Sequence, residues 1–314
     1  MRSFCTLFDS NYLTRGLALY HSLRKTGARF TLYVYCFDEL CHRLLTEMEL
    51  PGVVLVTLEQ FESPELLAVK GGRSRGEYCW TCTSQIVQHA LDCFKLQNVT
   101  YLDADLYFFA DPAPLLEEFE AAGASVLITD HRYTRRYDQS QLSGKYCVQF
   151  VSFNADPRGL TVLKWWSERC LEWCYNRHED GKFGDQMYLD DWTERFEGVH
   201  VLRHLGGGVA PWNVQQYAVG PGPALGQVPV VFYHFHDLAW YAGGSFHLGR
   251  YRISSRAVDL LYRPYIRALQ EALGEVRRLR EDFSLGQLAE SAPRASLWKR
   301  MANKIKGKYR VIQG

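Results

Sequence analysis

Short apolar runs alternate along the chain with longer segments in which apolar residues recur every three or four positions. The short runs predict β-strands, and the longer segments predict amphipathic helices. The predicted strands are 2–8, 30–37, 53–58, 98–105, 124–130, 148–154, 198–202 and 229–235. The predicted helices among them include 11–25, 78–95 and 160–175. Strands that alternate with helices in this way predict an α/β fold with a mostly parallel sheet covered on both faces.

Polar residues follow several of the predicted strands. They are Asp9 after the first strand, Asp103 and Asp105 at the end of the fourth, Asp130 and His131 after the fifth, and His234 and His236 at the end of the last. For any one aspartate, a turn or a satisfied polar residue at a strand end is the commoner case. In a parallel α/β sheet, however, ligands bind beyond the carboxyl ends of the strands. Together these residues predict one shared polar site at that edge.

Asp103 and Asp105 form the one Asp-x-Asp sequence of the chain. In an extended segment both side chains point to the same face, about 7 Å apart along the backbone. Carboxylates at that spacing suit Mg²⁺ or Mn²⁺, which bind oxygen ligands and complete their coordination with water and phosphate. We therefore expect a divalent metal site here. A solvated turn is the alternative interpretation.

His234 and His236 lie two positions apart at the end of the last predicted strand, so both face the same way. An imidazole suits Mn²⁺ better than Mg²⁺, and each histidine is a candidate third ligand. A buried histidine bonded to the backbone is the alternative for either residue. The sequence leaves open which of the two would bind the metal.

The overall composition is that of a globular protein. The 314 residues include 36 basic and 35 acidic side chains, and this balance gives no reason to expect nucleic acid as a partner. The first residues lack the apolar core of a signal peptide, and no run of about 18 apolar residues occurs. The nine cysteines are scattered through apolar segments, as is typical of a reducing cytosol. We therefore expect a cytoplasmic protein.

Several of these motifs resemble those of GT-A-fold glycosyltransferases, in particular glycosyltransferase family 8 and its bacterial relatives, over residues 1–250. The segment of that family that contacts the nucleobase resembles FDSNYLTRG, which carries Asp9 and Tyr12. Its metal motif resembles YLDADLYFFADP, which contains the aspartate pair, and its metal-binding histidine ends a late strand as His234 does in VVFYHFH. The resemblance implies a nucleoside diphosphate-sugar donor, with uridine as the expected base.

Two further segments match the family. VQFVSFN ends in Asn154 where a family strand ends in asparagine, and FGDQMYL carries Asp185 and Gln186 where the family has an Asp-Gln pair. If the reaction inverts the anomeric carbon, Asp185 is our candidate for the base that takes the acceptor proton. If it retains the configuration, as the resemblance implies, Asp185 and Gln186 would position the donor sugar. The residues themselves do not decide between these mechanisms.

The chain also departs from the family pattern. After the late histidine the family carries Lys-Pro-Trp, which holds the diphosphate, whereas this chain reads FHDLAWYAGGSFHLGRYR. Arg250 or Arg252 is a candidate replacement for that lysine. The glycine-rich segment 206–217 resembles the acceptor-side or product-side loop of the family, where glycines allow the backbone to approach a ligand.

The expected function is metal-dependent transfer of a sugar from a nucleoside diphosphate-sugar to a saccharide or glycolipid acceptor. Two alternatives use the same residues. The first is a metal-dependent phosphohydrolase, because a cation held by carboxylates also serves phosphate ester cleavage. The second is a protein of the same fold that binds sugars or nucleotides without turnover.

The chain divides into a catalytic domain at 1–255, a helical segment at 256–290 packed on it, and a tail at 291–314. No acidic residue follows Glu290, and 294–310 contains basic residues interleaved with apolar ones. Such a segment predicts either an amphipathic helix on an anionic membrane surface or a solvated, disordered tail. With a membrane contact, we would expect a lipid-linked acceptor such as that of bacterial lipopolysaccharide synthesis at the inner face.

Overall fold

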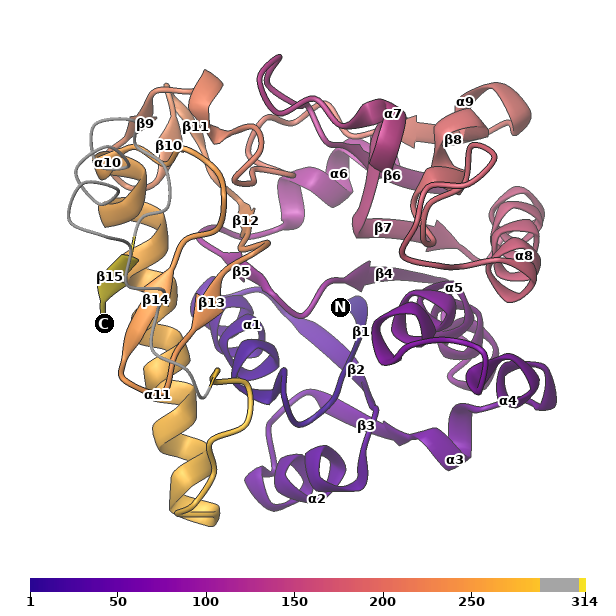
Figure 1. The fold of residues 1–314 in the computed structure, drawn as a ribbon. Helices are drawn as coiled ribbons and strands as arrows, with labels where there is room; N and C mark the ends of the chain where they lie inside the picture. The colour runs from indigo at the N-terminus through magenta and orange to yellow at the C-terminus, as the bar shows by residue number, and fades with distance from the viewer. Residues whose placement is uncertain (289–310) are drawn as a thin grey trace.

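The computed structural model describes residues 1–288 and 311–314, and its centre is a seven-stranded sheet (Figure 1). From edge to edge the strands are β3 (Val53–Thr57), β2 (Phe30–Cys36), β1 (Arg2–Phe8), β4 (Asn98–Leu102), β7 (Tyr146–Asn154), β6 (Val126–Asp130) and β8 (Val199–Val201). β7 runs antiparallel to both of its neighbours, and all other pairs in this sheet are parallel. The predicted α/β fold with a mixed, mostly parallel sheet is therefore confirmed.

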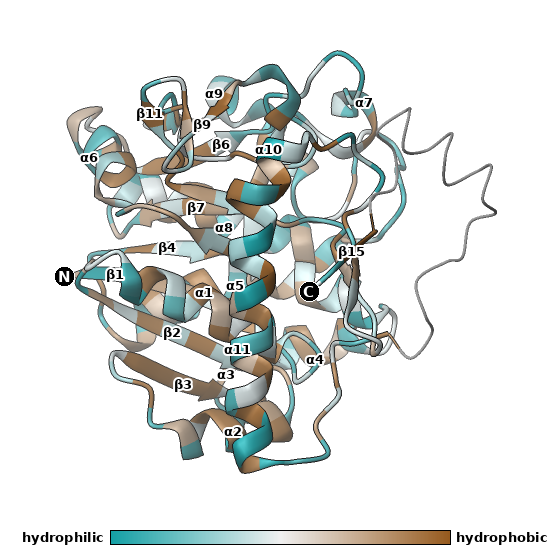
Figure 2. Cartoon of the chain, turned by 90° about the vertical axis from the view of Figure 1, so that its left-hand side faces the viewer, coloured by the Kyte–Doolittle hydropathy of each residue, from teal (hydrophilic) through white to brown (hydrophobic). Residues whose placement is uncertain are grey.

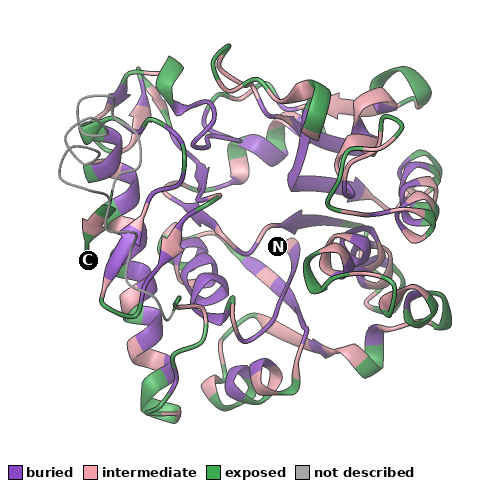
Figure 3. Ribbon diagram, in the orientation of Figure 1, coloured by how far each residue is buried: buried purple, intermediate pink, exposed green. Residues whose placement is uncertain are grey.

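Helices cover both faces of this sheet. The α-helices of the described residues are α1 (Leu13–Lys25), α2 (Glu39–Met48), α3 (Leu58–Phe61), α4 (Pro64–Lys70), α5 (Arg75–Cys93), α6 (Ala113–Ala121), α7 (Ser140–Ser143), α8 (Pro157–Glu172), α9 (Trp192–Arg195), α10 (Ser255–Ala257) and α11 (Arg263–Leu279). Alternate side chains of each strand enter two different cores. In β2, Leu32 and Val34 pack with α1 and α11, whereas Tyr33 and Tyr35 pack with α5 and α8. Figure 3 shows the buried strands between helices whose outer sides are exposed.

The loops that follow β1 and β2 are held by aspartate side chains. Asp9 Oδ1 accepts hydrogen bonds from the backbone N–H groups of Asn11 (2.8 Å) and Tyr12 (3.1 Å), just before α1 begins. Asp38 caps α2 by accepting from Cys41 N at 2.7 Å. Both residues satisfy N–H groups that a helix start leaves without partners. Asp9 and Asp38 therefore fix the backbone conformation of both loops at the carboxyl edge of the sheet.

Short strands form three smaller sheets beside the main one. Their members are β5 (Leu106–Phe108) with β12 (Phe232–His234), β9 (Val219–Gly220) with β10 (Ala224–Leu225) and β11 (Val228–Pro229), and β13 (Ala239–Trp240) with β14 (Ser245–His247) and β15 (Val311–Gln313). The connecting segments include the 3₁₀ helices η1 (Met187–Asp191) and η2 (Val214–Gln216). The pairing of β5 with β12 joins parts of the chain that are more than 100 residues apart, and it determines the geometry of the site.

The predicted strand 98–105 ends before the aspartate pair. A hydrogen bond from Leu106 N to Asp103 O (3.2 Å) closes a tight turn that contains both acidic residues. The extended geometry that we expected for Asp103 and Asp105 is therefore wrong. The turn forms because the chain leaves the main sheet to pair with β12, and Phe235 N donates to Asp105 O at 3.1 Å. Hydrogen bonds from Leu106 N and Phe235 N therefore fix the backbone of Asp103 and Asp105.

The helical segment predicted at 256–290 contains α11, and a π-helical turn, η3 (Val258–Tyr262), leads into this helix. α11 packs against α1, and hydrophobic and hydrophilic residues alternate around it, as one buried face requires (Figure 2). Of the predicted tail, Val311–Gln313 forms strand β15 on the edge of β14, a strand that the sequence did not predict. Residues 294–310, which carry the predicted membrane contact, lie outside the described residues. In the described ranges, no helix is long and apolar enough to cross a bilayer.

Candidate active site

Two carboxylates and one imidazole meet where the turn after β4 contacts the end of β12. His234 Nε2 lies 3.1 Å from Asp105 Oδ1 and 3.7 Å from Asp103 Oδ2. One ligand atom from each of the three residues lies within 4.8 Å of the other two. We call these three residues the Asp-Asp-His cluster. Of the two predicted histidines, His234 belongs to it.

The three groups of the Asp-Asp-His cluster strongly influence one another. Burial raises the pKa of Asp103 to about 6. Burial also acts to raise the pKa of Asp105, but the charge of His234 and its hydrogen bond bring it down to about 2. Burial disfavours the charged form of His234, yet the Asp105 carboxylate holds its pKa well above the ordinary value. One protonated ring thus balances part of the buried negative charge.

The donor set of the Asp-Asp-His cluster fits a divalent cation such as Mn²⁺ or Mg²⁺. Carboxylate oxygens are the ligands that both ions prefer, and an imidazole nitrogen is accepted more readily by Mn²⁺. Three protein ligands leave further coordination positions for water and for phosphate oxygens. A bound cation would replace the positive charge that the ring of His234 now supplies.

A third buried carboxylate, that of Asp185, lies beside the cluster. Tyr101 donates from its hydroxyl to Asp103 Oδ1 at 2.9 Å. Thr83 of α5 lies beside both Tyr101 and Asp185, and its hydroxyl influences the pKa of each. Asp185 is 6% exposed, and burial together with the charge of Asp103 raises its pKa to about 7. Tyr101 and Thr83 therefore connect the predicted metal ligands to the predicted Asp-Gln pair.

The backbone around the Asp-Gln pair is anchored by neighbouring side chains. Trp166 Nε1 donates to Asp185 O at 2.8 Å, and Gln186 Nε2 donates to Ser143 O at 2.6 Å. Asp190, a nearby acid, accepts from the backbone of Lys145 and the residue after it. Asp190 thus has a structural role, which leaves Asp185 as the carboxylate that faces the Asp-Asp-His cluster.

Asp9 and Tyr12 lie at the start of α1, on the same edge of the sheet. Asp9 Oδ2 is 2.5 Å from Nη2 of Arg75, which also lies 3.2 Å from Asp38. Tyr12 is 44% exposed, and its ring faces the guanidinium of Arg15, 4.6 Å from the ring centroid. The carboxylate of Asp105 contributes, after burial, to raising the pKa of Tyr12. The structure therefore brings Tyr12 close to the Asp-Asp-His cluster.

Aromatic rings surround the other side of the cluster. Trp212 contacts His234 edge-on, with ring centroids 5.3 Å apart, and contacts His236 at 5.5 Å. His131 stacks on Tyr133 at 4.6 Å and also contacts Trp212 at 5.2 Å. Burial lowers the pKa of His131 to about 3 and that of His236 to about 4, so both rings are neutral at physiological pH. His236 is thus a neutral neighbour of the cluster.

The glycine-rich loop 206–217 carries Trp212 to this position. A Cβ added at Gly206 would lie 2.1 Å from Pro229 O, and one at Gly208 would lie 2.5 Å from Thr129 Cγ2. The glycines that we expected to allow approach to a ligand therefore allow the loop to pack against the protein itself. The loop then pairs with β12, since His234 N donates to the backbone of this loop at 2.9 Å.

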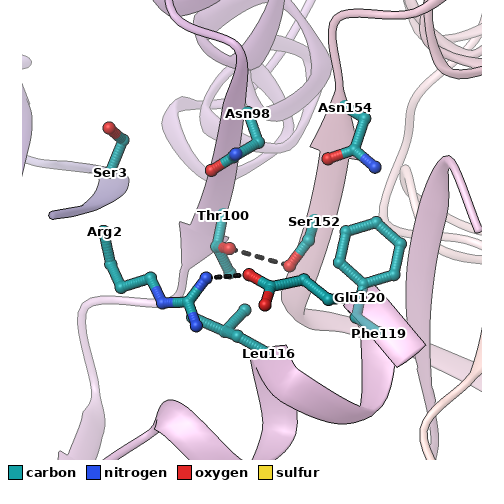
Figure 4. A pocket seen from close by; sticks show the side chains of 9 residues that line it. All are labelled: Arg2, Ser3, Asn98, Thr100, Leu116, Phe119, Glu120, Ser152 and Asn154. Carbon is teal, nitrogen blue, oxygen red and sulfur yellow. Dashed lines mark hydrogen bonds and ion pairs between the residues drawn. The ribbon is translucent and has the colours of Figure 1, made fainter. Parts of the chain in front are cut away.

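Two predicted donor-site residues lie away from the cluster. Asn154 ends β7, and because β7 is antiparallel, that end lies at the opposite edge of the sheet, where it pairs with Asn98. Its side chain donates to Ala124 O at 2.9 Å and borders a small pocket lined by residues of β1, β4, β7 and α6 (Figure 4). Arg250 is exposed and lies 4.0 Å from the carboxylate of Asp237. The structure therefore does not bring Asn154 to the site, and Arg250 lies at its periphery.

Sequence reasoning missed three residues of this site. Tyr101 sits on the apolar pattern of β4, Thr83 on the inner side of α5, and Arg15 in the first turn of α1. Arg15 and Tyr101 lie inside FDSNYLTRG and YLDADLYFFADP, but the resemblance gives neither residue a role, and Thr83 lies in no motif. Their proximity to the aspartates depends on how β4, α1 and α5 pack, which no local pattern encodes.

The fold is shared with solved glycosyltransferase structures. It is similar to galactosyltransferase LgtC in complex with donor and acceptor sugar analogs (TM-score 0.55, 13% identity, 86% of this chain and 95% of that one). It is also similar to an LgtC variant in which an active-site glutamine is replaced by glutamate (TM-score 0.52, 12% identity, 87% and 95%). A third likeness is to the glycosyltransferase GlyE of Streptococcus pneumoniae (TM-score 0.53, 14% identity, 93% and 66%). The chain is therefore a GT-A-fold protein.

Sequence comparison places the chain in a family. It is 30% identical to the uncharacterized protein YfnD of Bacillus subtilis over 298 residues, which cover 92% of this chain and 95% of YfnD. It is 35% identical to the uncharacterized protein YfnF of the same organism over 245 residues, or 74% of this chain and 80% of YfnF. No protein-family model matches the chain. The chain belongs to the same family as YfnD and YfnF.

Proposed function

We propose that this protein is a metal-dependent glycosyltransferase that moves a sugar from a nucleoside diphosphate-sugar, with uridine as the expected base, to a saccharide or glycolipid acceptor. The observation that carries the proposal is the Asp-Asp-His cluster, formed by a turn and a strand end in a GT-A fold. The ligand atoms of this cluster lie within 4.8 Å of one another, as a single bound cation requires.

In this proposal Asp103, Asp105 and His234 hold Mn²⁺ or Mg²⁺. The cation, when bound, neutralises charge on the diphosphate as that group leaves. Tyr101 holds the Asp103 carboxylate through its hydroxyl at 2.9 Å. His234 is fixed in place because β12 pairs with β5 and loop 206–217 contacts its backbone. The ligands are therefore pre-positioned by elements from distant parts of the chain.

Tyr12 would contact the nucleobase of the donor. Its ring is 44% exposed and lies next to the cluster, so that a base stacked on it has its diphosphate within reach of the metal ligands. Asp9 accepts the backbone N–H groups of Asn11 and Tyr12 and contacts Arg75. We assign Asp9 the part of shaping the base-binding loop, with its second oxygen directed to Arg75.

Asp185 and Gln186 would position the donor sugar, and we propose retention of the anomeric configuration. Asp185 is almost completely buried beside Thr83, which suits a positioning residue better than a base that must reach an acceptor. Gln186 follows it directly, and LgtC also has an active-site glutamine. In the reaction, the bond between the anomeric carbon and the diphosphate oxygen breaks, and its electron pair stays on that oxygen. The acceptor oxygen forms the new bond to carbon, and its proton passes to the departing diphosphate.

The acceptor would enter on the aromatic side of the cluster. Trp212 and Tyr133 lie 6.2 Å apart beside His131, and Tyr251 lies 6.4 Å from Trp212. Trp212 and Tyr251 are buried and support the half-buried Tyr133, whose face could bind the apolar face of a sugar ring and leave the sugar hydroxyls free for hydrogen bonds. A saccharide acceptor is the class that this wall suits, whether it is free or attached to a lipid.

A thermal-shift screen tests the proposal. The full chain is heated with uridine, guanosine, adenosine or cytidine diphosphate, each in the presence of Mn²⁺, Mg²⁺ or a chelator. A ligand that binds the folded state raises the melting temperature. We expect one nucleotide to raise it only when metal is present, with no such rise in Asp103→Asn. The control is Asp282→Asn, which removes a carboxylate that is 77% exposed and should behave as wild type.

Two results would contradict the proposed function. One is the absence of a shift with every nucleotide and metal in the folded wild type. The other is an equal shift in Asp103→Asn, because nucleotide binding would then be independent of the cluster. Release of inorganic phosphate from the nucleoside diphosphates by the wild type would favour a phosphohydrolase instead.

A further inference from the structure

Arg15 is a nearly buried cation, and the Asp105 carboxylate, whose pKa it helps to lower, balances its charge only from beyond salt-bridge distance. The residue is 8% exposed, and its Nη2 donates to Leu238 O at 3.1 Å. Its guanidinium carbon lies 4.6 Å from the centre of the Tyr12 ring. Among the described residues, no carboxylate oxygen lies within 4.0 Å of this guanidinium, although surface arginines of the same chain do form such pairs. The hydrogen bond to the Leu238 carbonyl uses only one of the five N–H groups of the Arg15 guanidinium.

This placement is costly for the folded protein. A buried charge that forms no direct ion pair is disfavoured because it has lost hydration, and the more distant charge of Asp105 offsets this only in part. Arg15 also sits in the first turn of α1, where the helix dipole presents its positive end. By contrast, Arg24 and Lys25 of the same helix lie in its last turn, where a cation is favoured. An anionic ligand would remove both disadvantages of Arg15.

Arg15 lies between the two ends of the proposed donor site. On one side is the ring of Tyr12, which we assign to the base. On the other side is the Asp-Asp-His cluster: Leu238 follows His234 by four positions, and Phe235 N is bonded to Asp105 O at 3.1 Å. A diphosphate joins the ribose to the sugar, so it must cross the space between base and metal. Arg15 borders this space.

We propose that Arg15 binds the diphosphate of the donor and stabilises it as it leaves. This inference rests on the proposed function. When the anomeric carbon–oxygen bond breaks, its electron pair moves to the diphosphate, and the guanidinium can donate two hydrogen bonds to the oxygens that gain charge. The chain lacks the Lys-Pro-Trp sequence after its late histidine, and Arg15 takes the place of that lysine from a different part of the chain. Arg250 is less suited, because it is exposed and faces Asp237.

Calorimetric titration of the full chain in Mn²⁺ tests this assignment. The probes are the four nucleoside diphosphates of the screen and the matching nucleosides without phosphate. For the diphosphate that binds the wild type, we expect Arg15→Gln to weaken binding about tenfold or more, as for a lost charge-assisted contact. Binding of the nucleoside should stay unchanged. Arg24→Gln, which removes an exposed arginine from the same helix, is the matched control and should bind both probes as wild type does.

The outcomes separate the two claims. If the wild type binds no nucleoside diphosphate with metal, the proposed function fails and Arg15 has no role in it. If the wild type binds but Arg15→Gln binds the diphosphate equally well, only the Arg15 assignment fails. Equal weakening of nucleoside and diphosphate would also overturn it, since that result indicates a structural role under Tyr12. Should Arg15→Gln not fold, Arg15→Lys decides: we expect unchanged nucleoside binding and diphosphate binding weaker by about threefold or more, because an ammonium cannot form the paired contacts.

Discussion

Asp185 offers a test of the site's electrostatics that needs no substrate. Its carboxyl group is 6% exposed, and burial together with the charge of Asp103 raises its pKa from 3.8 to about 7. The native state therefore holds this proton more tightly than the unfolded chain does. Between about pH 4 and pH 7 the unfolded state binds fewer protons, so this group makes the protein less stable as pH rises. Asp185→Asn removes the titration and keeps a side chain of the same shape.

The expected magnitude follows from the shift in pKa. A difference of about three units, at 1.36 kcal/mol each, corresponds to about 4 kcal/mol at most, reached above pH 7. Asp185→Asn should therefore gain stability relative to wild type between pH 4.5 and pH 8, by a few kcal/mol. The gain should vanish at the acid end, where the wild-type carboxyl group is protonated in both states.

Urea denaturation followed by far-UV circular dichroism measures this difference. Both proteins are unfolded at several pH values with a chelator present, because a cation at the neighbouring cluster would stabilise the ionised form of Asp185. Asp282→Asn is the control, since its carboxylate is 77% exposed and its substitution should give no pH-dependent difference. A constant difference between Asp185→Asn and wild type, or one that grows toward acid pH, would refute the reasoning.

Three further predictions concern the metal, the core and the base. Mn²⁺ should bind more weakly at pH 6 than at pH 8 in calorimetry, because the raised pKa of His234 means that the metal must displace a proton; pH-independent affinity would contradict this. Gly159→Ala should lower the free energy of urea unfolding by about 2 kcal/mol or more, since its Cβ would lie 2.2 Å from Asn154 O. The control Gly274→Ala adds a Cβ that meets no atom within 4 Å, so it should be neutral or stabilising. Equal effects of the two substitutions would be inconsistent with this packing. Tyr12→Ala should weaken nucleotide binding by about 1–3 kcal/mol and Tyr12→Phe by much less; an equal loss in the two variants would argue against stacking.

The sequence predicted the sheet and the ligand residues of the Asp-Asp-His cluster, but it did not predict the backbone geometry of the cluster. Asp103, Asp105 and His234 were found from their positions after apolar runs, and the structure brings them together. The turn around the aspartates was missed because it depends on the pairing of β5 with β12, a contact between distant segments. No pattern within 98–105 shows where the chain leaves the sheet.

Strand direction explains the misplacement of Asn154. The apolar run of β7 has the same composition whether the strand is parallel or antiparallel, but its direction decides which edge of the sheet receives its last residue. Arg15 was overlooked for a related reason. A basic residue in an amphipathic helix is ordinarily a solvated one, and only the packing of α1 against the segment at Leu238 buries it.

The central claim is that the Asp-Asp-His cluster supports transfer from a nucleotide-sugar, and consumption of the donor tests it most directly. A panel of nucleotide-sugars is incubated with the full chain, and release of the nucleoside diphosphate is followed by mass spectrometry, with water as the default acceptor. We expect one donor to be consumed in Mn²⁺ or Mg²⁺, and no consumption with a chelator or in Asp105→Asn. Consumption by Asp105→Asn at the wild-type rate, or in the presence of the chelator, would contradict the account.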